Sequence, residues 1–231
     1  MFARASRTAA RARILLYGAS GSGKTYSALL LACGLGEKTA LIDSEAGSGS
    51  LYADLMEYDT TLVDVDGATC KQYMDAIAEA AQSGYGTLII DGITPFWDAI
   101  KDQANKEEKK GKKTFQIWGD LTPVYRRLVT RLLSYPGHII VTCRAKTEYL
   151  MEDYIDRSGA KKVKPTKIGL TPDFRQGFDY EFSTVIRLDQ EHHAHVEKDR
   201  LGVIGTDYLE SIDSATGNRL VKGKETKNEQ K

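Results

Sequence analysis

The sequence predicts one α/β domain with a mainly parallel sheet, helices on both faces and an antiparallel extension toward its C-terminal end. Its length of 231 residues suits a single domain of ordinary size. Short apolar runs alternate with helix-forming segments and are joined by short loops, which favours parallel strands connected by helices. A glycine-rich segment, residues 18–25, follows the first apolar run, and open α/β sheets place their ligand sites at such strand ends.

The expected strands and helices follow from apolar runs and from the helical spacing of apolar residues. Strands are expected at residues 14–17, 38–43, 62–65, 87–91 and 138–142, and helices at 26–33, 70–82 and 121–133. Further along, residues 180–188 and 192–197 alternate like a pair of antiparallel strands, with a turn between them. The domain is therefore expected to span residues 13–217.

The composition argues against several classes of protein. Lysine plus arginine equals aspartate plus glutamate at 32 each, so a polyanion site would need local clustering of charge. Cys33, Cys70 and Cys143 form no C-x-x-C pair, which is typical of a reducing compartment, and we expect a cytoplasmic protein. No apolar run approaches the roughly 18 residues that cross a bilayer, so we expect no membrane partner.

Both ends of the chain differ from the domain in composition. Residues 1–12 carry arginines and no acid, a pattern shared by mitochondrial presequences and by loose basic arms. A basic N-terminal arm is the favoured interpretation, because the first strand begins almost at once. Residues 218–231 are polar, and we expect a disordered tail there.

The segment Gly18-Ala19-Ser20-Gly21-Ser22-Gly23-Lys24-Thr25 matches the phosphate-loop pattern G-x-x-x-x-G-K-[ST] at every fixed position. Its glycines allow backbone conformations that bring successive N–H groups onto one anion, and the following helix adds the dipole of its N-terminus. A glycine- and serine-rich turn with a chance lysine is the alternative, but the flanking strand and helix argue against it. All residues of the segment are candidate contacts to a nucleoside triphosphate.

Three polar side chains predict that the ligands are ATP and magnesium (Mg²⁺). Lys24 would place a positive charge on the outer phosphates, and the Thr25 hydroxyl would hold the ion. Asp91 ends an apolar strand, where a second acidic residue reaches the ion through water. For Asp91 the alternative is a side chain that merely forms the turn after the strand.

The strand after the first helix ends in Leu41-Ile42-Asp43-Ser44-Glu45. A carboxylate at that place can face the γ-phosphate and polarise a water molecule, although Glu45 could also simply cap the loop. In this spacing the sequence resembles the RecA family of recombinases, whose corresponding strand ends in Asp-x-Glu. The resemblance implies that Glu45 is the catalytic glutamate and that Asp43 supports it.

The resemblance implies two further roles. RecA-like proteins carry a polar sensor of the γ-phosphate after the strand that ends here at Thr142; Arg144 occupies that region, and it departs from the glutamine of RecA. Lys198 and Arg200 are similar to the Lys-x-Arg segment by which DnaB- and RadA-type ATPases reach a neighbouring subunit's nucleotide. That similarity implies a homo-oligomer, a ring or filament with nucleotide at subunit interfaces. An ordinary basic residue at a strand end is the alternative for each.

From about Arg13 to Gly202 the sequence looks like the phage-encoded RecA-like ATPases related to single-strand annealing proteins. The matching stretches are Tyr17–Thr25, Leu41–Glu45, Ile89–Trp97, Arg144–Tyr149 and Gly177–Phe182, of which the last three are the more specific. This resemblance implies an ATPase core that acts on single-stranded DNA in homologous recombination or strand annealing, in the cytoplasm of a bacterial host.

Two lysine-rich segments are the expected DNA contacts. Residues 101–118 and 157–167 would stand where RecA-like proteins carry DNA-binding loops, with lysines on phosphates and aromatic rings stacked on bases. The candidate residues are Lys112, Lys113, Trp118, Arg157, Lys161, Lys162 and Lys164. Alternatively, these charge runs are solvated helix ends or loops and the aromatic rings belong to the edge of the core.

Other interpretations of the chain stay open. A non-catalytic nucleotide switch or loader would need the same phosphate loop, and so would a small-molecule kinase. A kinase usually carries an arginine lid, and the sequence has no Arg-x-x-Arg lid between Asp91 and the sensor strand. The spacing of His192, His193 and His195 fits no standard zinc site, so Mg²⁺ is the metal that we expect.

Overall fold

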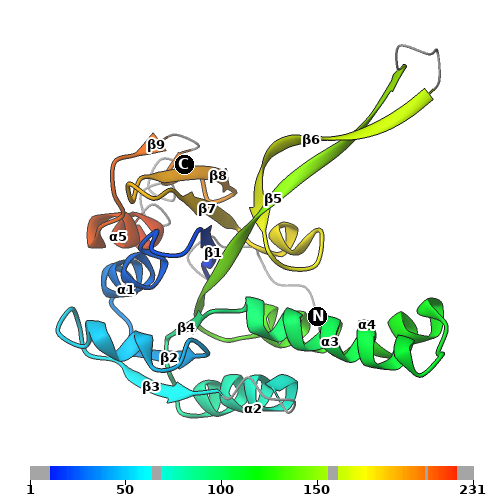
Figure 1. The fold of residues 1–231 in the computed structure, drawn as a ribbon. Coiled ribbons are helices and arrows are strands. Elements are labelled where there is room, and N and C mark those ends of the chain that lie inside the picture. The colour runs from blue at the N-terminus through cyan, green and yellow to red at the C-terminus, as the bar shows by residue number, and fades with distance from the viewer. Residues whose placement is uncertain (1–10, 64–68, 156–160, 206–207, 223–231) are drawn as a thin grey trace, which may run out of the picture.

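A mixed sheet of nine strands forms the centre of the structure, a computed structural model that describes residues 11–63, 69–155, 161–205 and 208–222 (Figure 1). The described strands are β1 (Arg13–Gly18), β2 (Thr39–Asp43), β3 (Asp59–Leu62), β4 (Thr87–Asp91), β5 (His138–Ile155), β6 (Lys161–Pro172), β7 (Thr184–Leu188), β8 (Ala194–Asp199) and β9 (Tyr208–Leu209). The described helices are α1 (Lys24–Leu35), α2 (Thr69–Gln82), α3 (Thr94–Lys109), α4 (Thr114–Leu133) and α5 (Ser214–Lys222), with 3-10 turns η1 (Ser48–Tyr52) and η2 (Phe178–Glu181).

The strand order is β3-β2-β4-β5-β1-β7-β8-β9, with β6 paired to β5 outside this path. In this spatial order, neighbouring strands from β3 through β2, β4, β5 and β1 to β7 pair in parallel. Strands β8 and β9 continue the sheet in antiparallel fashion. This arrangement confirms the predicted α/β fold, a RecA-like phosphate-loop core with an antiparallel C-terminal extension. Because the central strands are parallel, Gly18, Asp43, Asp91 and Thr142 all stand at the same edge of the sheet.

Helices cover both faces of the sheet because its strands are apolar on both sides. In β1, Leu15 and Tyr17 belong to the cluster formed with α2, α3 and α4, whereas Ile14 and Leu16 belong to the cluster formed with α1 and α5. This two-residue alternation is the period of a strand. Burial of one such side chain stabilises a fold by about 1.5–3 kcal/mol, so both layers hold the central strands in register.

The charged segment after β4 is helical, not a mobile loop. Helix α3 runs to Lys109 and buries Phe96 and Ile100, spaced one turn apart, against the sheet. Its charged residues lie on the other side and include the Lys101–Asp98 ion pair, spaced by three positions. Of the two interpretations of this segment, the solvated helix is therefore the one that the structure supports.

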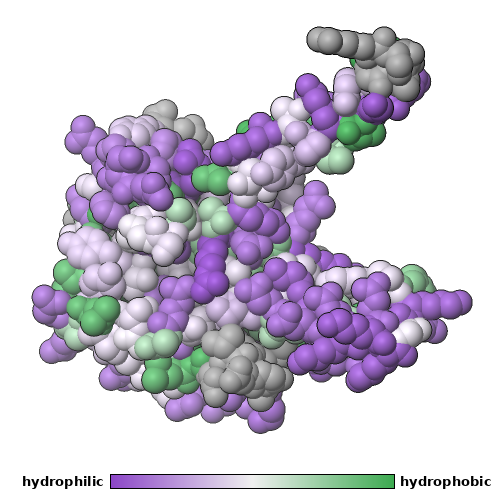
Figure 2. All heavy atoms as spheres, viewed as in Figure 1, coloured by the Kyte–Doolittle hydropathy of each residue, from purple (hydrophilic) through white to green (hydrophobic). Residues whose placement is uncertain are grey.

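Strand β5 is much longer than the strand expected at residues 138–142. It continues to Ile155 and pairs antiparallel with β6, from Ala145 opposite Pro172 to Ile155 opposite Lys161. The segment near Lys161, expected to be a loop, is thus a strand. Figures 1 and 2 show this two-stranded ribbon standing away from the body, and we call residues 145–155 and 161–172 the arm.

The expected ends of the domain need one correction. Helix α5 continues to Lys222, so residues 218–222 are helical and do not belong to a disordered tail. Gly34 of α1 and Gly217 of α5 have no side chains, which lets the two helices approach closely, and this packing explains why α5 forms. Residues 1–10 of the expected basic N-terminal segment and residues 223–231 of the expected tail lie outside the described residues. The same holds for residues 64–68, where the expected third strand ends.

None of the helices described in the structure has the combined length and apolar character needed to cross a membrane.

Candidate nucleotide-binding and catalytic site

The phosphate loop joins β1 to α1 and lines a cavity of about 1460 Å³. Gly21 and Gly23 have φ angles of 76° and 79°, a left-handed conformation that glycine adopts without steric cost. Gly23 is also the N-cap of α1, so the free N–H groups of the first helical turn face the loop. Gly18 is needed for space, because a Cβ atom there would lie 2.5 Å from the Leu188 carbonyl oxygen.

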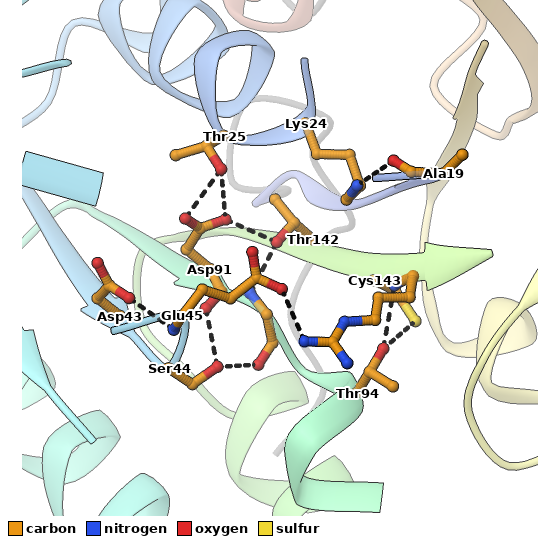
Figure 3. A network of polar contacts seen from close by, with 12 residues as sticks. Ala19, Lys24, Thr25, Asp43, Ser44, Glu45, Asp91, Thr94, Thr142 and Cys143 are labelled. Atoms are coloured by element: carbon orange, nitrogen blue, oxygen red, sulfur yellow. Dashed lines mark hydrogen bonds and ion pairs between the residues drawn. The ribbon is translucent and has the colours of Figure 1, made fainter. Parts of the chain in front are cut away.

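Lys24 arches back over the loop that it follows. Its Nζ donates a hydrogen bond of 2.6 Å to the Ala19 carbonyl oxygen (Figure 3). Burial lowers the pKa of Lys24, and the carboxylates of Glu45 and Asp91 partly offset this effect. A cation at the loop whose water shell is partly stripped interacts strongly with phosphate oxygens, which is the role expected for Lys24.

Thr25, Asp91 and Thr142 form one hydrogen-bonded group across three elements (Figure 3). The Thr25 hydroxyl lies 2.9 and 3.0 Å from the two carboxylate oxygens of Asp91, and the Thr142 hydroxyl donates to Asp91 at 2.8 Å. Asp91 is 1% exposed, and its burial raises the pKa to about 6, against the opposing effect of the two hydroxyl donors. Asp91 is therefore a buried, oriented carboxylate and not merely a turn former.

These residues fit Mg²⁺. The Thr25 hydroxyl and the Asp91 carboxylate offer only oxygen ligands beside the phosphate loop, and oxygen ligands are what Mg²⁺ prefers. Such sites use one or two carboxylates, with phosphates and water completing the coordination.

The loop after β2 aims Glu45 at the cavity. Both oxygens of Asp43 accept backbone N–H groups of this loop, from Glu45 at 2.7 Å and from Gly49 at 2.8 Å. Ser44 Oγ donates to the carbonyl oxygens of Asp91 and Gly92, which ties the loop to the end of β4. Asp43 thus acts on the position of Glu45, as expected of a supporting residue.

Glu45 and Arg144 form an ion pair in the wall of the cavity. Arg144 Nη2 lies 3.4 Å from Glu45 Oε1, and the side chains of Arg144 and Glu45 are 52% and 31% exposed. Exposed pairs of this kind contribute little to stability, about 0–1 kcal/mol. The effect of this ion pair is to position the Glu45 carboxylate. Arg144 itself is held in place, because its backbone N–H donates to Thr94 Oγ1 at 3.0 Å.

The remaining wall contains residues that the sequence did not single out as contacts. Tyr26, Tyr52 and Ile212 line it, and the two tyrosine rings meet edge to face with centroids 5.9 Å apart. His192 joins them, and its Nδ1 would lie 3.1 Å from a Cβ atom placed on Gly23. The sequence predicts His192 at the start of a strand, directly after a turn, and no spacing along the chain indicates that this turn lies beside the phosphate loop.

The turn that presents His192 is fastened by Asp189. One carboxylate oxygen accepts the N–H groups of Glu191 at 3.1 Å and His193 at 2.8 Å, and the other lies 3.0 Å from His195 Nε2. The hydrogen bond with His195 is the largest cause that lowers the pKa of Asp189 to about 2. Side-chain ligand atoms of Asp189, Glu191 and His193 lie within 4.8 Å of one another, but the Asp189 oxygens already serve this turn.

Lys198 and Arg200 do not join the site of their own chain. Strand β8 runs antiparallel to β7, and Asp199 pairs with Thr184, at the sheet edge opposite the phosphate loop. Lys198 Nζ donates to the carbonyl oxygens of Asp179 at 2.9 Å and Tyr180 at 3.2 Å, and burial lowers its pKa. The Arg200 side chain is exposed.

The expected DNA contacts fall on two separate projections. Lys112 and Lys113 form the turn between α3 and α4, where Lys112 pairs with Asp120 at 2.5 Å. Trp118 lies within α4 and packs against Trp97, with ring centroids 5.9 Å apart, so it belongs to the edge of the core. The lysines 161, 162 and 164 lie on β6 of the arm and are exposed, and residue 157 lies outside the described residues.

Comparison with known families agrees with this geometry. A family model described as an AAA domain matches residues 10–228, which is nearly the whole chain. No curated protein matches the sequence. The match covers the phosphate loop, Glu45, Asp91 and Arg144 together, and AAA domains bind and hydrolyse nucleotides. The chain therefore belongs to the AAA domain family of phosphate-loop ATPases.

Proposed function

We propose that this protein is a Mg²⁺-dependent ATPase in which Glu45 accepts the proton of the attacking water. One observation carries the proposal: Glu45 lines the same cavity as Lys24 and Thr25, although it comes from a different loop. A carboxylate that faces a phosphate site across a cavity can orient and deprotonate water. The organised loop around Asp43 supports this role, because it fixes the Glu45 backbone.

The chemical step is an in-line displacement. The water oxygen bonds to the γ-phosphorus, the bond from that phosphorus to the β,γ-bridging oxygen breaks, and ADP and inorganic phosphate leave. Glu45 takes the proton of the water, while Lys24 and the loop N–H groups stabilise charge on the phosphate oxygens. Mg²⁺ held by Thr25 and Asp91 would neutralise charge on the β- and γ-phosphate oxygens.

Single-stranded DNA is the proposed effector of this ATPase. The resemblance to phage proteins of recombination and annealing supports it, and so do the lysines on the arm and at the α3–α4 turn. Figure 2 shows a wide opening between these two projections. Exposed lysines near aromatic rings are the side chains that hold a flexible phosphate backbone, and Lys164 lies 5.9 Å from the Tyr154 ring.

Arg144 offers a physical link between that effector and the chemistry. It pairs with Glu45 in the cavity, and the same strand continues from Arg144 into the arm. A load on the arm would therefore move Arg144 and change how firmly it holds Glu45. This link relates DNA binding to water activation without any contact between DNA and nucleotide.

The test is ATP hydrolysis by the full chain with and without single-stranded DNA. We expect DNA to raise the rate of the wild type, and Glu45→Gln to lower kcat about 100-fold with an unchanged affinity for a non-hydrolysable ATP analogue. The matched control is Glu79→Gln, an exposed glutamate of α2, which should keep the wild-type rate. Equal rates for wild type and Glu45→Gln, together with no response to DNA, would discard this assignment.

A nucleotide switch or loader is the second candidate. The Glu45–Arg144 ion pair favours it, because a carboxylate that is held by a guanidinium is not free to orient the attacking water. In that case ATP would bind and change the assembly of subunits while turnover stayed negligible. A single-turnover measurement with excess enzyme separates the candidates, because a switch would release no phosphate on the time scale of the assembly change.

The proposed ATPase works as a homo-oligomer, a ring or filament with nucleotide between subunits. Arg200 supports this, because its exposed side chain lies at the sheet edge opposite its own phosphate loop and is free to reach another subunit. Arg200 is a better candidate for that role than Lys198, whose Nζ is already bound to two carbonyl groups.

A further inference from the structure

The arm exposes an unusual amount of apolar surface. Of the fifteen large hydrophobic side chains exposed among the described residues, eight lie on β5 and β6 beyond residue 148. By strand alternation, one face of the ribbon carries Tyr149, Met151, Ile155 and Val163, exposed by 57, 63, 69 and 55%. Asp153, Lys161 and Lys167 lie on the same face. An isolated two-stranded hairpin is marginally stable in water, and three or more strands with an apolar face are needed for independent stability.

The two edges of the arm carry opposite charges. From residue 147 to 155, β5 contains Glu148, Glu152 and Asp153 and no basic residue. From residue 161 to 172, β6 contains four lysines and no acidic residue; they are Lys161, Lys162, Lys164 and Lys167. Two β5 edges would therefore repel each other, and so would two β6 edges, whereas a β5 edge attracts a β6 edge. This selects against pairing of like edges.

The opposite charges also stand at the same height along the arm. The register places Glu152 opposite Lys164, Asp153 opposite Val163 and Tyr154 opposite Lys162. If one arm lies beside another at equal height, as symmetry-related copies in a ring do, the acids of one β5 face the lysines of the neighbouring β6. Because β6 runs antiparallel to β5, this contact repeats the pairing already present within each arm.

We propose that the arm binds a second copy of this chain, edge to edge, with β5 of one copy beside β6 of the next. Such a head-to-tail contact builds a ring or a filament, because each copy offers one acidic edge and one basic edge. The added strands widen the two-stranded ribbon into a sheet, and the exposed side chains of Tyr149, Met151, Ile155 and Val163 of neighbouring copies then lie on the same face of that sheet. This inference names the surface for the proposed oligomer, but it does not depend on ATP hydrolysis.

Nucleic acid is the other partner that the lysines of β6 could bind. The acidic residues of β5 argue against nucleic acid as the partner of both edges of the arm. A phosphate backbone would be repelled by Glu148, Glu152 and Asp153 along half of the arm. Edge pairing also leaves the face that carries Tyr154 and Lys162 open to the single-stranded DNA proposed above. Self-association through the arm and DNA binding are thus separately measurable.

The experiment is a charge-swap complementation followed by sedimentation velocity of the full chain without DNA. One variant reverses the acidic edge, Glu148→Lys with Asp153→Lys, and the other reverses the basic edge, Lys161→Glu with Lys167→Glu. All four side chains are exposed and face uncharged residues across the ribbon, so neither variant breaks a charge pair within the arm. The matched control reverses two exposed lysines of α3, Lys106→Glu with Lys109→Glu.

We expect the wild type and the control to associate, and each edge variant alone to associate about tenfold more weakly. An equal mixture of the two edge variants should recover association, because the doubly basic arm then meets the doubly acidic arm. The far-ultraviolet circular dichroism spectrum should stay the same in all samples, which verifies that the domain is folded. Glu45→Gln should also associate like the wild type, so a failure of the ATPase proposal leaves this test intact.

Three outcomes would overturn the inference. The first is a wild type that sediments as a monomer at every concentration, and the second is edge variants that associate as well as the wild type. The third is a mixture that does not recover association. In that third case, tighter single-stranded DNA binding by the variant that carries Glu148→Lys and Asp153→Lys would make the arm a nucleic-acid surface.

Discussion

Arg144 Nη2 lies 3.4 Å from Glu45 Oε1, although the two residues are 99 positions apart in the chain. The pair joins the loop after β2 to the point where β5 leaves the body and enters the arm. Glu45 is the residue that we assign to water activation, and Arg144 is its partner among the described residues. The partner thus belongs to the strand that forms the projecting ribbon.

Arg144→Gln should uncouple the arm from hydrolysis. Glutamine keeps a polar side chain but removes the positive charge, so Glu45 is released from the ion pair and can turn toward the attacking water. We expect the rate of ATP hydrolysis without DNA to rise about fivefold, which is the lower end of typical allosteric effects. The stimulation by single-stranded DNA should disappear. Steady-state hydrolysis with and without DNA measures both effects. A variant that keeps the wild-type stimulation ratio would contradict the link through Arg144.

Asp91→Asn should change how stability depends on pH. Burial raises the pKa of Asp91 from 3.8 to about 6, so the folded protein binds more protons than the unfolded chain between these values. The free energy of unfolding therefore falls as the pH rises through this window, and the asparagine variant escapes that loss. We expect it to be more stable than the wild type by about 1–3 kcal/mol at neutral pH, with the difference fading toward about pH 4.

Urea denaturation at these two pH values measures the difference, with Asp102→Asn as the control for removal of one exposed carboxylate. An Asp91→Asn variant whose advantage is the same at both pH values would contradict the assignment. The same substitution should weaken Mg²⁺-dependent ATP binding at neutral pH, because an amide replaces a carboxylate beside the ion.

His192→Gly should separate stability from nucleotide binding. His192 has a φ angle of 67°, a left-handed conformation that costs a non-glycine residue about 1–2 kcal/mol. Glycine relieves this strain, so stability should be kept, while loss of the ring beside Gly23 weakens binding of an ATP analogue. Calorimetric titration measures the affinity, and His192→Asn serves as the polar variant that tolerates the same backbone conformation. Unchanged affinity in both variants would show that the ring is only part of the wall.

Arg200→Ala and Glu45→Gln should complement each other if Arg200 acts across a subunit interface. Each variant alone is expected to lose most of its hydrolysis, about 100-fold, because a cation that stabilises the transferring phosphoryl group is missing in one and the base in the other. In an equal mixture some interfaces combine an intact Glu45 with an intact Arg200. Hydrolysis by the mixture should therefore exceed the mean of the separate samples. A rate equal to that mean would count against catalysis in trans.

The sequence predicted where the candidate site residues lie better than it predicted the periphery. The phosphate loop, Asp91 and Glu45 each follow an apolar strand, and the structure brings these strand ends to one edge of the sheet. Helix α3 was missed, because its solvated face is so densely charged that the buried Phe96–Ile100 face was hidden. The arm was missed because its half-polar alternation lacks the continuous apolar run by which buried strands are found.

By itself, the sequence determined the chemistry of the loop and the order of the parallel core, since glycine positions and apolar periodicity are local properties. Only the tertiary structure decided which distant residues meet: His192 beside Gly23, Arg144 beside Glu45, and Trp118 in the core edge. The physical reason is that such contacts depend on strand order and on packing between elements, and no spacing along the chain encodes them directly.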